Sequence, residues 1–367
     1  MARPVADGGL MRASTLLAVG VAGAVAVAAV VSGVRSSGDD SPAATTAVAA
    51  TTAATTTTEE IPVGDLRRLP QPAAGAYAGH LVVFDALTCQ PLRIVLPAVT
   101  KAASEAPPIC NIWPSPGGKA FARTGPPELV EVHVAAPLET AGTDAGVTFA
   151  PGARDGALTI TDDGTVAVCD GARVRVSLGG RVQTLLAFTP VEGVFDERCV
   201  TGALGTRVVR LGDDRRTLVD VRTRQVVRRL AQPVLAPLAG LTSAPDGLVI
   251  AIDVADGTPQ GVVYAADGTV AVPRRPVGAA TRFRKLLLAR GGGAVAILTS
   301  RGWQITSLRS GLTMTQPGGA RVTDVAFSPA GDAVAATTDV GILFAAVPGL
   351  APTALLPGTF QVVAWLP

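Results

Sequence analysis

Four proline-marked turns recur along this chain at nearly regular spacing. Pro116, Pro245, Pro329 and Pro367 each follow a short apolar run, and the first three are followed by a glycine within two residues. The four prolines lie 129, 84 and 38 residues apart, which is roughly three, two and one multiples of about 42. Self-similarity at such a period indicates a repeated unit of several short strands. We therefore expect an array of similar units rather than unrelated domains.

A second repeated pattern consists of an apolar run, a polar turn and another apolar run. It is clearest at 84–95 and 219–227, and weaker at 263–272 and 305–314. Thr and Val suit a pleated surface, and Asp-Gly supplies the positive φ of tight hairpins. From about Tyr77 onward helical periodicity is almost absent. The sequence therefore predicts an all-β domain of short antiparallel strands.

Together the two patterns predict seven innermost strands. The corresponding fold is a seven-bladed β-propeller, with six or eight blades as alternatives. The innermost strands are expected to begin near Ile109, Ala157, Val191, Leu238, Thr281, Val322 and Phe360.

The two ends of this region predict how the ring closes. The strand at 360–366 has no partner after it, and the hairpin at 81–96 has no innermost strand before it. Pairing the two would complete one blade and leave no open strand edge. The residues expected at this closure are Phe360, Val362, Trp365, Val83 and Phe84.

The segment 327–331, Phe-Ser-Pro-Ala-Gly, looks like the turn that follows the inner strand in WD40-like and TolB-like repeats. On this motif the region from about 75 to 367 resembles the β-propeller superfamily, although the Trp-Asp pair that names the WD40 family is absent. The resemblance implies an exported propeller on a membrane stalk.

The N-terminal region predicts a membrane anchor. No charged residue lies between Arg12 and Arg35, and 13–34 gives 22 mostly apolar positions. A helix of that length spans roughly 30 Å, the thickness of a bilayer core. The positive-inside rule places the tail 1–12 in the cytoplasm and the propeller outside, in a single-pass protein. The alternative is a cleaved signal peptide and a secreted protein.

A linker is expected at 35–74, ahead of a propeller domain at 75–367. Its central part, 41–60, contains eight Thr and seven Ala and no aromatic residue. Such a stretch cannot bury enough apolar surface to offset its ordering entropy, so we expect a disordered stalk.

Four cysteines in an exported domain predict two disulfides. Three pairings can be drawn, and we favour neighbours in sequence, Cys89 with Cys110 and Cys169 with Cys199. No pair has C-x-x-C spacing and neither histidine lies near them, which argues against a zinc or redox site.

Eight arginines cluster within one predicted blade. We interpret them as a solvated outer hairpin, with Arg222 and Arg224 on one strand face and Val219 and Val221 pointing inward. The alternative is a basic patch for an acidic protein, an anionic lipid or a cell-wall phosphate. The cluster comprises Arg207, Arg210, Arg215, Arg216, Arg222, Arg224, Arg228 and Arg229.

No residue pattern predicts catalysis, a cofactor or a metal site. His80 and His133 are the two histidines, and no Gly-x-Ser-x-Gly motif is present. The acidic turns lack the spacing of an EF-hand, and 291–293 lacks the lysine of a phosphate-binding loop. A net charge of +2 gives no reason to expect a nucleic-acid partner.

These observations predict a non-catalytic protein-binding or scaffold module of the cell envelope, with envelope proteins as partners. The alternatives are an exported propeller hydrolase or lactonase-like enzyme and a small-ligand-binding sensor. The lysines are Lys101, Lys119 and Lys285, against a large majority of arginine. With the abundant Ala, Val and Gly, this bias predicts a GC-rich, actinobacterial genome.

Overall fold

The computed structural model describes most of the chain beyond residue 65. The described residues are 66–85, 91–95, 98–101, 112–124, 129–134, 145–148, 158–169, 173–178, 181–189, 197–255, 257–278, 283, 285–299 and 302–367. They form short strands and turns almost throughout, which confirms the predicted all-β fold. No helix among these residues is long and apolar enough to cross a membrane. The predicted anchor at 13–34 and most of the predicted linker lie outside the described residues.

The described strands form seven antiparallel sheets of four strands each, hydrogen-bonded in chain order within six of them. One of these six sheets consists of β4 (Ile112–Pro114), β5 (Ala120–Thr124), β6 (Leu129–Val134) and β7 (Ala145–Thr148). The next consists of β8 (Leu158–Ile160), β9 (Val166–Cys169), β10 (Arg173–Leu178) and β11 (Arg181–Ala187). A third consists of β12 (Thr201–Leu204), β13 (Arg207–Leu211), β14 (Thr217–Asp220) and β15 (Val226–Arg229). The fourth sheet consists of β16 (Leu238–Ser243), β17 (Val249–Ala255), β18 (Thr258–Tyr264) and β19 (Val270–Pro276). The fifth consists of β20 (Lys285–Leu288), β21 (Ala294–Thr299), β22 (Gly302–Ser307) and β23 (Thr313–Met314). The sixth consists of β24 (Val322–Phe327), β25 (Ala333–Thr338), β26 (Gly341–Ala346) and β27 (Pro352–Pro357). Short 3-10 turns lie at η2 (Glu197–Cys199), η3 (Arg290–Gly292) and η4 (Pro317–Gly319).

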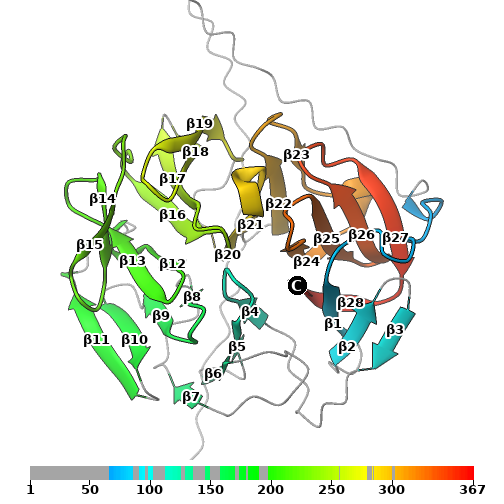
Figure 1. Ribbon diagram of the computed structural model, residues 1–367, viewed down its shortest axis with the longest axis horizontal. Helices are drawn as coiled ribbons and strands as arrows, with labels where there is room; N and C mark the ends of the chain where they lie inside the picture. The colour runs from blue at the N-terminus through cyan, green and yellow to red at the C-terminus, as the bar shows by residue number, and fades with distance from the viewer. Residues whose placement is uncertain are drawn as a thin grey trace, which may run out of the picture. The chain divides into compact units, whose positions relative to one another are not determined.

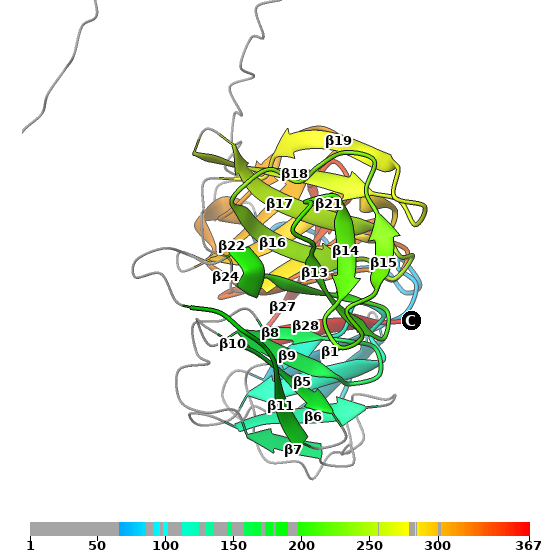
Figure 2. The same ribbon diagram turned by 90° about the vertical axis from the view of Figure 1, so that its left-hand side faces the viewer.

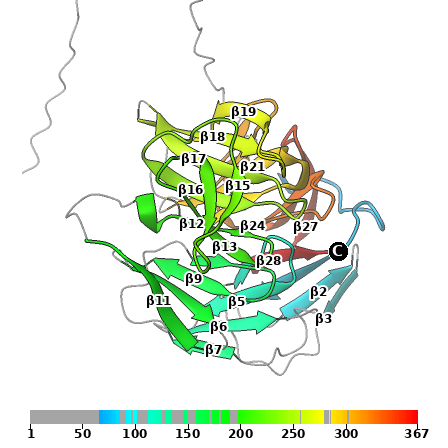
Figure 3. The same cartoon turned by 60° about the vertical axis from the view of Figure 1, so that its left-hand side comes forward.

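The innermost strands of successive sheets pack against one another. β4 contacts β8, β8 contacts β12, and the series continues through β16, β20 and β24 to β28. Figure 1 shows the sheets following one another from green (β8–β15) through yellow (β16–β21) to red (β27). Figure 2 shows β16 to β19 as successive strands of one sheet, and Figure 3 shows β5, β6 and β7 of another side by side. Four-stranded meanders packed in this way are the blades of a β-propeller.

The first and last strands share the seventh sheet, as the sequence predicts. β28 (Phe360–Leu366) pairs with β1 (His80–Asp85), which continues into β2 (Pro91–Val95) and β3 (Ala98–Lys101). Val83 lies opposite Val363, and Phe84 lies opposite Val362. Val83, Phe360 and Trp365 are buried, while for Phe84 and Val362 the structure describes the backbone pairing. One sheet therefore joins segments from the two ends of the described region.

Two innermost strands begin four or more residues later than predicted. The third, β12, begins at Thr201 rather than near Val191, and the fifth, β20, begins at Lys285 rather than Thr281. Glu197 explains the third start, because its carboxylate accepts the Leu238 N–H and binds the Arg215 guanidinium, which fixes a 3-10 turn ahead of the strand. The apolar run near Val191 lies outside the described residues.

The packed domain begins before the predicted boundary at 75. Leu66 is fully buried in a cluster with Trp303, Leu343 and Leu355. The carbonyl of Pro70 accepts a hydrogen bond from the Leu355 N–H at 3.0 Å, which ties this segment to the outer strand β27. The part of the predicted linker from residue 66 to 74 therefore belongs to the folded unit, because it covers an apolar face of the β24–β27 sheet.

The repeated turn is present, and it is more widespread than the prolines indicate. In each copy a glycine N–H donates to the carbonyl three residues earlier, and that glycine has a positive φ, which residues with a Cβ rarely adopt. Copies without proline follow β8 and β20 as well. The five glycines are Gly118, Gly164, Gly247, Gly292 and Gly331. The glycine, rather than the proline, is the signature of this turn.

We expect Trp365→Ala to destabilise the whole domain. Trp365 is 8% exposed, its indole N–H donates to the Ala78 carbonyl at 3.1 Å, and its ring packs edge-on against Tyr77 and Phe344. Truncation should lower the free energy of unfolding by about 3 to 5 kcal/mol, measured by urea denaturation. Leu312→Ala is the control, because Leu312 is 42% exposed and its loss should change stability by less than about 0.5 kcal/mol. Equal effects of the two substitutions would contradict the importance of this sheet.

Tyr264 should make the protein less stable in alkali. Its hydroxyl donates to the Gln232 carbonyl at 3.2 Å, and burial raises its pKa to about 12. The unfolded chain releases this proton near pH 10, about two units earlier, so the free energy of unfolding should fall between about pH 10 and 12. Tyr264→Phe should flatten that part of the pH profile in urea denaturation and remove the corresponding step in absorbance at 295 nm. If the wild type and Tyr264→Phe show the same dependence of unfolding free energy on pH, Tyr264 is not the group responsible.

Candidate functional site

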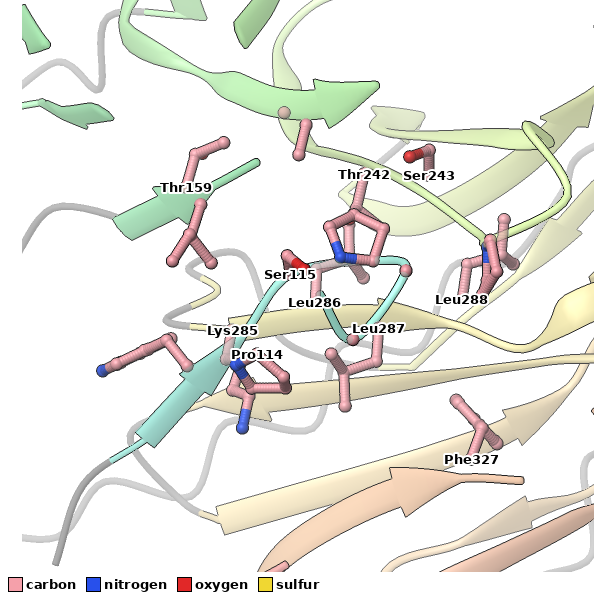
Figure 4. A pocket seen from close by; sticks show the side chains of 18 of the residues that line it. Pro114, Ser115, Thr159, Thr242, Ser243, Lys285, Leu286, Leu287, Leu288 and Phe327 are labelled. Carbon is pink, nitrogen blue, oxygen red and sulfur yellow. The ribbon is translucent and has the colours of Figure 1, made fainter. Parts of the chain in front are cut away.

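A cavity of about 600 Å³ lies among the innermost strands of all seven sheets. Figure 4 shows Thr159 on β8, Thr242 on β16, Leu287 on β20 and Phe327 on β24 around the same space. Small-molecule sites generally have volumes of roughly 300 to 1,000 Å³ and are mostly apolar with a few polar groups. The cavity has the size and the position of a ligand site in the centre of a propeller.

Aromatic and aliphatic side chains form most of the cavity wall. Trp113, Phe283, Phe327 and Trp365 line it together with leucine, valine and alanine from the innermost strands. Trp365 also belongs to the buried cluster of the last two sheets, with Phe344 and Phe360. The wall is therefore continuous with the packing between sheets, which makes the cavity rigid.

Hydroxyl groups interrupt the apolar wall. Thr159 and Thr201 bond to each other at 2.9 Å between β8 and β12. Two further polar atoms, the Ser243 hydroxyl and the Trp113 indole N–H, are buried and have no hydrogen-bond partner within the described part of the chain. Buried polar groups normally have partners, so these two donors call for an explanation.

The repeated turns form the rim at the carboxyl ends of the innermost strands. The Ser115 hydroxyl accepts the N–H groups of Lys119 and Ala120 within its own turn. Other bonds link neighbouring turns: the Gly117 N–H donates to Asp162 at 2.8 Å, and the Gly291 N–H donates to Asp246 at 2.7 Å. These bonds join two separate pairs of neighbouring turns along the rim.

A buried ion pair lies in the wall between β20 and β24. Lys285 and Asp324 are each 7% exposed, and the Lys285 ammonium lies 3.1 Å from the Asp324 carboxylate. The Trp113 and Trp303 rings flank the ammonium, with centroids 5.6 and 5.3 Å away. Cation–π attraction adds to the ion pair when the cation is desolvated. No pattern in the sequence predicts this pair, although its members lie 39 residues apart, close to one repeat.

The disulfide between Cys169 and Cys199 forms as predicted, with Cα atoms 5.6 Å apart. Both cysteines line the cavity, and the bond joins β9 to the 3-10 turn ahead of β12. It therefore links two neighbouring sheets. Cys89 and Cys110 lie outside the described residues, so their pairing stays a prediction.

The eight predicted arginines do not form one patch. Arg222 and Arg224 lie in the turn after β14 and not on a strand face, because the Asp220 carboxylate accepts the N–H groups of Arg222 and Thr223 and ends the strand. Val221 is buried, as predicted. Arg207 begins β13 at the end of the sheet that carries the β14–β15 turn. Arg229, on β15, pairs with Thr217 at the opposite end.

Three arginines of this group have structural partners. Arg210 binds Asp213 at 3.3 Å, and Arg215 binds Glu197 at 2.7 Å. Arg228 donates to the Gly247 carbonyl at 2.9 Å, and burial lowers the pKa of its guanidinium. Arg216 precedes β14 and is exposed. None of these eight side chains lines the cavity.

The two histidines lie in different sheets. His80 begins β1 opposite Leu366, and His133 lies on β6 opposite Phe121. The structure therefore does not bring them together. Within the described ranges no group of three or more His, Cys, Asp or Glu side chains is placed to hold a metal ion. The chemistry that the described site offers is binding through apolar contact, hydrogen-bond donors and positive charge.

Removing one partner of the Lys285–Asp324 ion pair should destabilise the fold. Lys285→Met would leave the Asp324 carboxylate buried without its ammonium, and we expect the free energy of unfolding to fall by about 3 to 5 kcal/mol in urea denaturation. The double variant Lys285→Met, Asp324→Leu should recover part of that loss. Asp213→Asn is the control, because Asp213 is 90% exposed and its ion pair should contribute less than about 1 kcal/mol. A double variant less stable than either single variant would contradict this account.

Comparison with solved structures finds likenesses to this chain, and one of them is described here. No protein-family model matches the chain, and no curated protein sequence matches it. The crystal structure of TolB from Acinetobacter baumannii is similar over 82% of this chain and 69% of its own chain, with 15% identity and a TM-score of 0.40. The assignment of a β-propeller fold rests on the sheets described above.

Proposed function

We propose that this chain is a non-catalytic binding module that receives its ligand in the central cavity. The observation that carries the proposal is the cavity of about 600 Å³, which residues from all seven innermost strands line together. A space formed by every sheet is a property of the whole fold, and its apolar wall with few polar groups suits a ligand.

The proposal includes the architecture and setting predicted from sequence. Seven blades, closed into a ring by β28 and β1, would give the cavity a fixed diameter. The module would act outside the cytoplasm in the cell envelope, carried on the N-terminal segment. The Cys169–Cys199 disulfide supports that setting, because disulfides persist in oxidising compartments. An envelope protein would contact the rim of repeated turns.

Filling the cavity should abolish binding without unfolding the protein. Thr242 lines the cavity and is half-buried, so Thr242→Trp places an indole in that space. Immobilised full-length protein is incubated with an extract of cell-envelope metabolites and peptides, and retained compounds are measured by mass spectrometry. We expect at least tenfold lower recovery from Thr242→Trp than from the wild type.

Thr223→Trp is the matched control, because Thr223 is exposed in the β14–β15 turn and away from the cavity. It should retain wild-type recovery. Thermal melting of all three proteins verifies that they are folded. The same recovery from the wild type and both variants would overturn the proposal.

A further inference from the structure

We propose that the cavity takes a small ligand with an apolar body and a carboxylate, and that the carboxylate binds at the rim beside Arg290 and Ser243. This inference rests on the proposed function and adds the chemical class of the ligand. Three observations carry it: the charge of the lining side chains, the donors without acceptors, and the apolar wall.

The ionisable side chains among the described lining residues are both cations, Lys285 and Arg290. Lys285 is neutralised by Asp324 within the wall. Arg290 lies on the turn after β20 and is exposed, and its guanidinium contacts the Pro329 carbonyl at 3.4 Å. Arg290 therefore places positive charge at this rim.

Acidic side chains of the repeated turns accept hydrogen bonds within the rim, and Asp332, close in sequence to Pro329, accepts one from the Ser328 hydroxyl. Asp246 accepts the Gly291 N–H, and Asp162 accepts the Gly117 N–H, so both carboxylates hold turns together. Neither of them lines the cavity. A ligand anion at the rim thus meets the Arg290 guanidinium without a carboxylate side chain among the described lining residues.

Ser243 supplies a donor on the sheet next to that of Arg290. It is 4% exposed, lines the cavity, and its hydroxyl has no partner among the described residues. Ser243 ends β16, and Arg290 follows β20, the innermost strand of the next sheet, and the Asp246–Gly291 hydrogen bond joins their two turns. A serine hydroxyl changes rotamer by rotation about one bond, and a ligand at the rim would offer Ser243 the acceptor that it lacks among the described residues.

A carboxylate satisfies this pair of groups. It only accepts hydrogen bonds, it has about four lone-pair sites, and its geometry matches a guanidinium. A cationic ligand would face Arg290 unfavourably, and a neutral ligand would leave its charge unused. Below the rim, Leu287 and Phe327 continue the wall and offer apolar contact to the rest of the ligand (Figure 4).

The test compares 4-phenylbutyrate with 4-phenylbutanamide, which share one apolar body and differ in charge. Binding to the full-length protein is measured by isothermal titration calorimetry at pH 7.4 and low salt. We expect the carboxylate to bind at least tenfold more tightly than the amide. Raising the salt concentration should reduce that preference, because the rim is exposed to solvent.

Substitutions distinguish the contribution of the Arg290 charge to binding from that of the cavity space. Arg290→Gln should reduce the preference to less than threefold while leaving the affinity for the amide unchanged, and Ser243→Ala should weaken carboxylate binding about threefold to tenfold. Arg309→Gln is the matched control, because Arg309 is exposed on the turn after β22 and outside the cavity. It should keep the full preference. Thr242→Trp should lose both ligands.

Two results overturn this inference and leave the proposed function standing. One is equal binding of the carboxylate and the amide, with both lost in Thr242→Trp. The other is binding of neither probe while Thr242→Trp still loses compounds retained from the extract. An unchanged preference in Arg290→Gln, with melting temperature preserved, would also refute it. Failure of the proposed function is a separate outcome, in which Thr242→Trp retains every compound that the wild type retains.

Discussion

The hydrogen bonds between β28 and β1 join the two ends of the described unit in one sheet. β28 also contacts β24, so this sheet packs against β24–β27. The apolar cluster around Leu81, Phe344 and Trp365 then packs across the junction between that sheet and β24–β27.

Contacts between neighbouring sheets repeat with the period of the sequence. The bonds from Gly117 to Asp162, from Thr159 to Thr201 and from Lys285 to Asp324 join residues 45, 42 and 39 positions apart. Equivalent positions in successive units therefore face each other across each junction. The period explains why one substitution at a junction, such as loss of Lys285, affects two sheets at once.

Much of the fold could be predicted because Pro and Gly mark turns through their own backbone geometry. The turns after β4, β16 and β24 carry both residues and are recognisable in the sequence, whereas the turn at Thr161 carries only Gly164 and is not recognisable as a copy of the repeat. The start of β12 could not be predicted, because it depends on Glu197 binding residues 18 and 41 positions away. Nothing in the local sequence around Glu197 indicates these partners.

The site was harder to predict than the fold for the same reason. Its wall is assembled from one short segment of every sheet. Three of these segments include the repeated proline turn, but that turn marks the fold and does not indicate a ligand site. Lys285 appears in sequence as one of three lysines, and nothing near it indicates that Asp324 and two indoles surround it. Aligning the units to the 39-residue offset would have brought Lys285 and Asp324 into register.

Trp365 belongs both to the cluster that joins the last two sheets and to the wall of the cavity. A ligand that contacts this ring binds the folded state and not the unfolded chain, so occupancy and folding are thermodynamically linked. The added stability grows as RT ln(1 + [L]/Kd), about 2.7 kcal/mol at a hundredfold excess over Kd. The empty protein would therefore melt at a lower temperature than the loaded one, and its melting temperature becomes a reporter for compounds of unknown identity.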